Sequence, residues 1–461
     1  MSDTVSLGSN SSAQNSETEL FNVADRGDTA MSKQRRNSVK KSKGRWDSKY
    51  FITIVCFMLV LMINIHLLMN KKGALADFLF EAPVGVPTVQ HEEYINHPKV
   101  YQRPNLPSCE GVPRRNLVFT KTHKTGGTTL TNILLRYAEK HHLVTGLPFG
   151  SHWELAGYPG LFDTELIDPI LPKYNLMCHH FRYGPDIKKV THPDHVFITM
   201  LRDPVGNFES EFGFFRDYPF PQWVGENGTI IDFMKNPSGL YNKKTPWYFR
   251  GKNYMSFDLG LEHESESASY IESAIEELEQ TYHLVLLTDY FEESLILLKE
   301  LMCMTDEDLV YLQLKTRTER VAVDPVLSQK IRSWNKLDTA IYDHFLAVFN
   351  EKIKAFGTTR MAQEVMKLRK NIAAVKEQCV ESVDTQREHS WIQRNVLRKG
   401  SPEICRKMNW GEVKYGDHIR ELQRSWTSIP PQPAISDREN KLRATQIEIL
   451  GEEVFQSTTK R

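Results

Sequence analysis

The feature that most constrains the fold of this chain is a repeated order of apolar run, loop and amphipathic segment. The run Leu117 to Thr120 predicts a buried strand, and apolar residues three and four apart from Leu130 to Ala138 predict a helix. The run Val196 to Leu201 predicts a second strand, after which Asp203 can cap a helix and Pro204 suits its first position. Alternating strands and helices favour an α/β fold whose mostly parallel sheet is flanked by helices.

A third unit follows the same order further along the chain. We expect a helix from Tyr270 to Gln280, a strand from His283 to Leu287, and a helix capped by Asp289 with Glu292 three residues on. After Leu327 the apolar spacing is nearly all helical. Because parallel strands end at one edge of a sheet, we expect ligands to bind in the loops that follow these strands.

An apolar run lies before these units, from Phe51 to Met69. It has 19 residues and contains no acidic residue, lysine or arginine, which is about the length of a membrane-spanning helix. Eight lysines and arginines stand in residues 33–49, against two lysines directly after the run. This asymmetry predicts that the N-terminus is cytosolic and that the chain after the run is lumenal or extracellular.

This topology places five of the six cysteines in an oxidising compartment, where disulfides persist. Since five is odd, at least one stays unpaired or pairs with a second copy of the chain, so a homodimer is open. Asn227 begins an Asn-Gly-Thr glycosylation sequon on the same side. The expected organisation is a disordered cytosolic tail over 1–50, a transmembrane signal anchor over 51–69, a proline-rich lumenal stem over 70–115, a main domain over 116–350 and a helical extension packing on it over 351–461.

The net charge of the chain is zero, which bears on what it can bind. Lysine plus arginine total 58 and aspartate plus glutamate total 58, which argues against a protein that coats nucleic acid through net basicity. Any site for an anion must therefore be built locally.

The loop between the first strand and helix predicts such a site. Paired glycines let a backbone approach an anion closely, a helix N-terminus offers unpaired N–H groups, and lysines add charge. It is not a Walker A loop, because its lysines precede the glycines. The alternative is an ordinary glycine turn with solvated lysines. The loop residues are Lys121, Thr122, His123, Lys124, Thr125, Gly126, Gly127, Thr128 and Thr129.

The loop after the second strand predicts another anion site. Arg202 ends that strand and Ser210 lies eight residues later, so a guanidinium and a hydroxyl can converge on a second phosphate. The alternative for Arg202 is an ion pair with Asp203 or another carboxylate. Two anion sites on adjacent strand ends suit a nucleotide with separated phosphates.

These two motifs resemble those of sulfotransferases. Residues 124–129 look like the 5′-phosphosulfate loop, and Arg202 with Ser210 is similar to the 3′-phosphate motif, which implies 3′-phosphoadenosine 5′-phosphosulfate as the donor. More closely, four segments resemble the galactose-3-O-sulfotransferase family: FTKTHKTGGTTLTNILLRYAEKHHL, HHFRYG, ITMLRDPVGNFESEF and YMSFDLGLE. The resemblance covers about Asn116 to Tyr342, with weaker signals around Cys379, Cys405 and Glu412. The resemblance implies a P-loop-like sulfotransferase fold and a type II Golgi membrane protein. It also implies sulfuryl transfer to a galactose hydroxyl, the 3-OH, in a glycolipid such as galactosylceramide or in a glycan.

Such a transfer requires a base, because an alcohol is a poor nucleophile until its proton is removed. His123 is our candidate, on its position beside Lys124 and on the resemblance, with Glu209 and His180 as alternatives. A histidine that merely orders the loop is the competing interpretation. Lys124, and secondarily Lys121, would stabilise the developing negative charge.

Other classes of function fit the residues less well. A noncatalytic lumenal glycan-binding protein would not need His123, Lys124 and Arg202 together, and a phosphoryl-transfer enzyme would need a Walker loop and carboxylates for magnesium. No metal is required, since lysine and arginine can neutralise the donor and no spaced Cys/His set is present. Disulfide pairing stays open, with Cys379 and Cys405 as the expected pair.

Overall fold

The structure is a computed structural model and describes residues 110–148, 154–167, 172–385 and 392–427, with 441, 443–447 and 449. The predicted tail, the apolar run 51–69 and most of the predicted stem lie outside the described residues. Within the described ranges, every helix is too short or too polar to cross a membrane.

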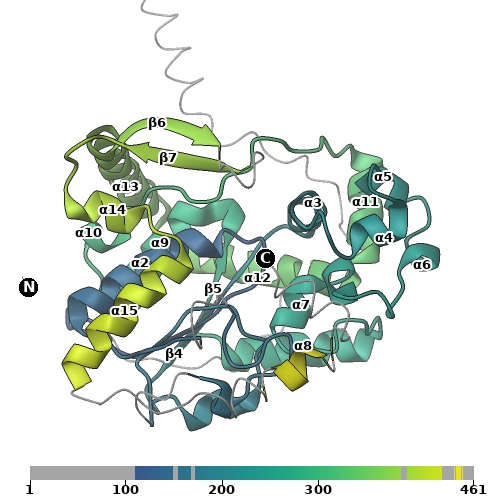
Figure 1. Cartoon of the computed structure of the whole chain (residues 1–461), viewed down its shortest axis with the longest axis horizontal. Coiled ribbons are helices and arrows are strands. Elements are labelled where there is room, and N and C mark those ends of the chain that lie inside the picture. Colours follow the sequence, from purple (N-terminus) through teal and green to yellow (C-terminus); the bar gives the residue numbers. More distant parts are fainter. Residues whose placement is uncertain are drawn as a thin grey trace, which may run out of the picture. The chain divides into compact units, whose positions relative to one another are not determined.

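A five-stranded parallel sheet forms the centre of the fold, in the order β2-β3-β1-β4-β5 (Figure 1). The strands are β1 (Leu117–Thr120), β2 (Thr145–Gly146), β3 (Leu176–Met177), β4 (Val196–Leu201) and β5 (Leu284–Leu287). Leu117 of β1 is in register with Leu176 of β3 and with Val196 of β4. The prediction of a mostly parallel α/β sheet is confirmed, and this arrangement fits a sulfotransferase fold.

Helices flank the sheet and bury a continuous apolar core against it. The long helices are α2 (Gly127–His141), α3 (Pro204–Phe214), α8 (Ala268–Thr281), α9 (Phe291–Met302), α11 (Pro325–Trp334), α12 (Lys336–Phe356), α13 (Thr358–Cys379) and α15 (Glu412–Thr427). The short ones are α4 (Phe220–Val224), α5 (Ile230–Phe233), α6 (Pro237–Leu240), α7 (Tyr254–Asp258), α10 (Asp306–Leu309) and α14 (Glu403–Met408). Single 3₁₀ turns are η1 (Thr164–Leu166), η2 (Pro185–Lys189), η3 (Tyr248–Gly251) and η4 (Thr288–Tyr290).

The predicted N-terminal cap is observed at helix α3 but not at helix α9. Asp203 caps α3, since its side chain accepts hydrogen bonds from the N–H groups of Val205 and Gly206, and Pro204 is the first helical residue. The expected cap of α9 by Asp289 is wrong, because Asp289 lies in η4 and accepts instead from the backbone N–H of Asp203 and from the Tyr342 hydroxyl. A contact between strand ends therefore replaces the local cap.

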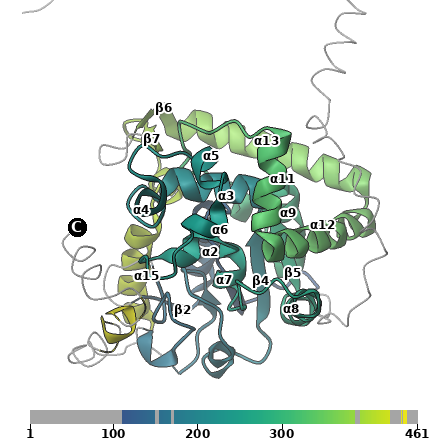
Figure 2. The same cartoon turned by 90° about the vertical axis from the view of Figure 1, so that its right-hand side faces the viewer.

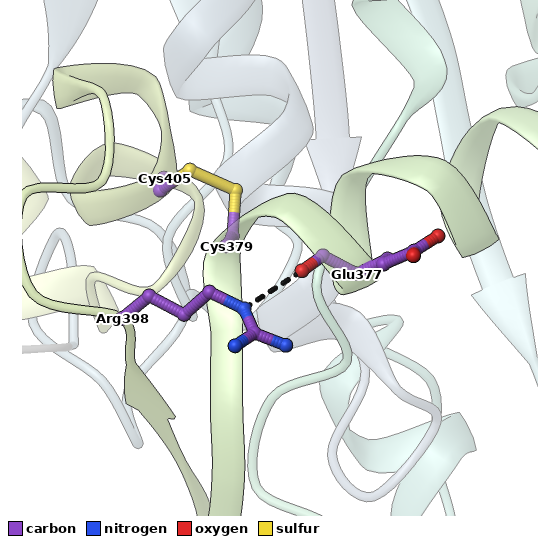
Figure 3. Close-up of a disulfide and its surroundings, with 4 residues drawn as sticks. All are labelled: Glu377, Cys379, Arg398 and Cys405. Atoms are coloured by element: carbon purple, nitrogen blue, oxygen red, sulfur yellow. Dashed lines mark hydrogen bonds between the residues drawn. A yellow bond between two sulfur atoms is a disulfide. The ribbon is translucent and has the colours of Figure 1, made fainter. Parts of the chain in front are cut away.

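The C-terminal region contains more than the helices that the sequence predicts. The predicted boundary at residue 350 falls inside α12, which packs beside α13 (Figure 2). An antiparallel hairpin of β6 (Val380–Thr385) and β7 (Gln393–Leu397) follows. The expected Cys379–Cys405 disulfide is confirmed and ties the end of α13 to α14 (Figure 3). Beside it, Arg398 Nε donates a 2.9 Å hydrogen bond to the carbonyl of Glu377.

Candidate active site

The loop between β1 and α2 has the backbone geometry of an anion site. Its chain turns through positive φ angles at Lys124 (60°) and Gly126 (78°), and Gly126 stands at the N-cap of α2. No described side chain caps this helix, so its first N–H groups are directed toward the loop. A Cβ at Gly127 would lie 2.8 Å from Cε of Lys121, so any other residue there would displace the buried Lys121 side chain.

Helix α15 contributes a carboxylate to this loop. Glu412 Oε1 lies 2.5 Å from Nζ of Lys121 and accepts a 2.7 Å hydrogen bond from the Thr128 hydroxyl. Both members of the ion pair are almost fully buried. Although burial disfavours charge, Lys121 and Lys315 hold the pKa of Glu412 well below its usual value. Lys121 is therefore the counterion of a buried carboxylate, which sequence reasoning missed.

Lys124 and Arg202 lie together at the two adjacent strand ends. Arg202 Nη1 donates a 3.1 Å hydrogen bond to the carbonyl of Lys124, whose ammonium sits 3.2 Å from the ring centre of Phe214. The Arg202 side chain crosses the first turn of α3, where a Cβ on Gly206 would lie 3.2 Å from its Nε. Ser210 is four residues after Gly206, on the same helix face, and is buried. The structure thus brings together the residues assigned to two phosphate groups.

Lys124 stands among like charges at this edge. Burial, followed by Lys315, Arg317 and Arg202, lowers the pKa of Lys124 well below its ordinary value. Burial also lowers the pKa of Arg202, while Asp289 opposes that shift. The alternative pairing of Arg202 with Asp203 is not what the structure has, since Asp203 binds Arg332 at 2.9 Å. An anion with several charges would relieve this repulsion.

His123 is held by a buried carboxylate from α7. Asp258 accepts hydrogen bonds from the His123 backbone N–H at 2.7 Å and from its ring Nδ1 at 2.9 Å, and a further one from the Tyr158 hydroxyl at 3.1 Å. With Nδ1 donating to Asp258, the proton is absent from Nε2, which can then accept one from a substrate. Asp258 is therefore a positioning residue for the candidate base.

Aromatic stacking fixes the imidazole plane. The His123 ring lies between His180 and Tyr254, with ring centres 3.8 Å and 4.6 Å away and near-parallel planes. Tyr254 and Asp258 are four residues apart on α7 and so face His123 together. Asp338 of α12 anchors the start of α7 by accepting from the backbone N–H groups of Met255 and Ser256.

The electrostatics of this cluster favour a neutral His123. Burial lowers the pKa of His123 below its usual 6.5, while Asp258 opposes the shift. Burial also lowers the pKa of His180 well below that value, and the neighbouring His123 adds to this. Two stacked imidazoles that both resist protonation leave His123 in the form that a general base requires near neutral pH.

Of the two alternative bases, Glu209 is engaged elsewhere, whereas His180 lies in the same cluster as His123. Glu209 forms an ion pair with Arg317 and accepts a 2.9 Å hydrogen bond from the N–H of Val321. His180 Nδ1 lies 3.1 Å from the carbonyl of Lys121. Asn227 of the sequon is exposed in the loop between α4 and α5. No group of three or more His, Cys, Asp or Glu that could hold a metal occurs in the described part of the chain.

A cavity of about 420 Å³ opens beside Thr128, at the start of α2. Four of its ten lining residues carry amide side chains, and Lys315 and Arg394 are charged. Its other lining residues come from the loop after α10, from β7 and from the turn before α15: Gln313, Leu314, Gln393, Asn395, Val396, Asn409 and Gly411. The loop is thus reachable from this polar side.

Comparison with known proteins agrees with the motifs. Residues 52–420 match the family model described as Galactose-3-O-sulfotransferase. Galactosylceramide sulfotransferase of Bos taurus is 37% identical over 332 residues, covering 66% of this chain and 77% of the relative. The Homo sapiens protein of that name is 37% identical over 349 residues, covering 69% and 81%. Galactose-3-O-sulfotransferase 3 of Mus musculus is 28% identical over 367 residues, covering 73% and 85%. The resemblance stated from the motifs is confirmed, and the chain belongs to the galactose-3-O-sulfotransferase family.

Proposed function

We propose that this sulfotransferase moves a sulfuryl group from 3′-phosphoadenosine 5′-phosphosulfate to the 3-OH of galactose, in a glycolipid such as galactosylceramide or in a glycan. One observation carries the proposal: the Asp258-bound His123 lies in the same loop as Lys124, whose carbonyl binds Arg202. A base and two cations at adjacent strand ends suit transfer between an anionic donor and an alcohol. The names of the relatives support galactose as the acceptor.

The residues present fit a doubly phosphorylated donor, because Lys124 stands among the like charges of Arg202, Lys315 and Arg317, and α2 lacks a side-chain cap in the described structure. The N–H groups of Gly126, Gly127 and Thr128, with Thr125 and Thr129, would hold the phosphosulfate end. Arg202 and Ser210 would hold the 3′-phosphate. When bound, the donor supplies an activated sulfuryl group and a phosphate leaving group.

His123 then acts on the acceptor. Its Nε2 accepts the proton of the galactose hydroxyl as the O–S bond forms, and Asp258 stabilises the imidazolium that results. Lys124 stabilises the negative charge that develops on the phosphate oxygen as the bond from that oxygen to sulfur breaks. Lys121 supports this indirectly, since its pairing with Glu412 holds the loop beside Thr128.

The cellular setting forms part of the proposal. A type II anchor over 51–69 would hold the enzyme in the Golgi membrane with its catalytic domain in the lumen. Glycosylation of the exposed Asn227 would follow from that topology. A homodimer remains compatible with it.

The test is transfer of labelled sulfate by the lumenal segment to a panel of galactosides and other glycosides. We expect product with galactose-terminated acceptors, and none with a galactoside whose 3-OH is removed. Glycan binding without transfer would support a noncatalytic protein instead, and transfer only to another sugar would refute galactose as the acceptor.

A further inference from the structure

Two buried polar atoms near His123 have no hydrogen-bond partner in the described structure. They are Oε1 of Glu211, a residue that is 2% exposed, and Nε of Arg250, a residue that is 9% exposed. Burying such a group without a partner is costly, so each one calls for an explanation. Neither residue takes part in the base or donor site described above.

Glu211 lies on the face of α3 that contacts the loop. One turn before it, Asn207 Nδ2 donates to the carbonyl of His123 at 2.9 Å. One turn after it, the ring of Phe215 lies 6.4 Å from that of His123. Residues four apart on a helix share a face, so the Glu211 carboxyl faces the same region as these two neighbours. The charges of Lys124 and Arg202 act on it there.

Arg250 reaches the same region from η3. Its guanidinium lies 4.0 Å from the ring centre of Phe215 and 3.9 Å from that of Trp247, while Nη1 donates to the carbonyl of Tyr218 at 3.2 Å. The rings therefore hold the guanidinium in place and Nε keeps its donor unused. The positive charge of Arg250 also contributes to lowering the pKa of His123.

We propose that Glu211 and Arg250 form the acceptor subsite, in which Glu211 Oε1 and Arg250 Nε hydrogen-bond sugar hydroxyls beside the one that His123 deprotonates. The proposal rests on the proposed function and extends it to recognition of the acceptor ring. A hydroxyl group both donates and accepts, so it can satisfy an orphaned carboxyl oxygen and an orphaned N–H. A site with such groups rejects an analogue that lacks the matching hydroxyl.

Burial, reinforced by Asp338 and Asp258, raises the pKa of Glu211 well above its ordinary value. A neutral carboxyl group has one O–H donor and one carbonyl acceptor, which a glutamine amide can replace but a methionine thioether cannot. The residue thus offers a matched pair of variants, Glu211→Gln and Glu211→Met, with Glu277→Met on the exposed face of α8 as the control.

The experiment measures KM and kcat for methyl β-galactoside and its 2-, 4- and 6-deoxy analogues, together with the Kd of 3′-phosphoadenosine 5′-phosphate. We expect Glu211→Met to raise the KM of the parent galactoside about tenfold and to change the nucleotide Kd less than about twofold. Glu211→Gln should stay within about threefold of wild type, as should the control. One deoxy analogue should bind poorly to wild type and show no further loss in Glu211→Met.

Arg250→Lys keeps the charge but removes Nε, so it should also raise the acceptor KM about tenfold, with sensitivity to a different hydroxyl. An unchanged KM in Glu211→Met, or an equal loss with every analogue, would overturn the proposal while leaving the proposed function standing. If Glu211→Met does not fold, the wild-type enzyme still tests the subsite. Equal KM values of the wild type for the parent galactoside and all its deoxy analogues would overturn the proposal. Wild type that sulfates no galactoside refutes the proposed function and this subsite together.

Discussion

Replacing Asp258 with asparagine should abolish most of the turnover while leaving the nucleotide site intact. The Asp258 carboxylate accepts from three donors: the His123 backbone N–H, His123 Nδ1 and the Tyr158 hydroxyl, at 2.7, 2.9 and 3.1 Å. An amide has only one oxygen, which accepts at most two of them, and its NH₂ group must face at least one. If the NH₂ group faces Nδ1, the imidazole proton moves to Nε2 and the base is lost. If it faces the Tyr158 hydroxyl instead, both His123 contacts stay on the amide oxygen, but the imidazolium loses the negative charge that stabilises it.

The magnitude follows from losing either the correct tautomer or the charge that stabilises the imidazolium. A reversed histidine of this kind costs about 10²–10⁴ in kcat, or roughly 3–5 kcal/mol in the activation free energy. We would measure kcat at saturating donor and acceptor, and the Kd of 3′-phosphoadenosine 5′-phosphate by calorimetry. Asp186→Asn is a matched control, because that carboxylate is partly exposed in an ion pair with Lys189. A folded Asp258→Asn enzyme with wild-type kcat would refute the reasoning.

Three further predictions follow from the same geometry. Arg202→Ala should weaken binding of 3′-phosphoadenosine 5′-phosphate at least tenfold more than binding of its analogue without the 3′-phosphate, and equal losses by calorimetry would make the arginine structural. The acid limb of log(kcat/KM) against pH should lie below pH 6.5, since burial lowers the pKa of His123 and protonation of Nε2 removes the base as pH falls; a midpoint above 6.5 would contradict this. Glu412→Gln leaves the buried Lys121 without its counterion and should lower the free energy of unfolding by about 3–5 kcal/mol in denaturant titrations, with partial recovery in the Lys121→Met, Glu412→Met double variant. No recovery in the double variant would point to a role for the pair beyond charge balance.

Local patterns predicted the parts of the fold that local chemistry determines. The Asp203 cap with Pro204 placed the start of α3 correctly, and the apolar runs located β1 and β4. Strands β2 and β3 have two residues each, which is too short for a periodicity to register. The hairpin of β6 and β7 was missed because most of its side chains are at least partly exposed, so its strands lack a buried face.

The sequence could not predict which carboxylates contact the loop, because these residues lie far from it along the chain. Asp258 is 135 residues from His123, and Glu412 is 284 residues from Thr128. Both residues lay in segments that resemble the family, but a resemblance names a segment and not the atom that a carboxylate will face. Glu209, an alternative base from the sequence, is paired with Arg317. Glu211 instead shares a face of α3 with Asn207, which contacts the loop, and the sequence does not reveal this difference.

The most direct test of the account is the separation of binding from turnover in His123→Ala. Since Lys124, Arg202 and the first turn of α2 do not depend on the imidazole, this variant should bind 3′-phosphoadenosine 5′-phosphate within about twofold of wild type. Its kcat for sulfate transfer to a galactoside should fall about a hundredfold or more. Turnover at the wild-type rate in this variant would remove His123 from the mechanism and contradict the central claim.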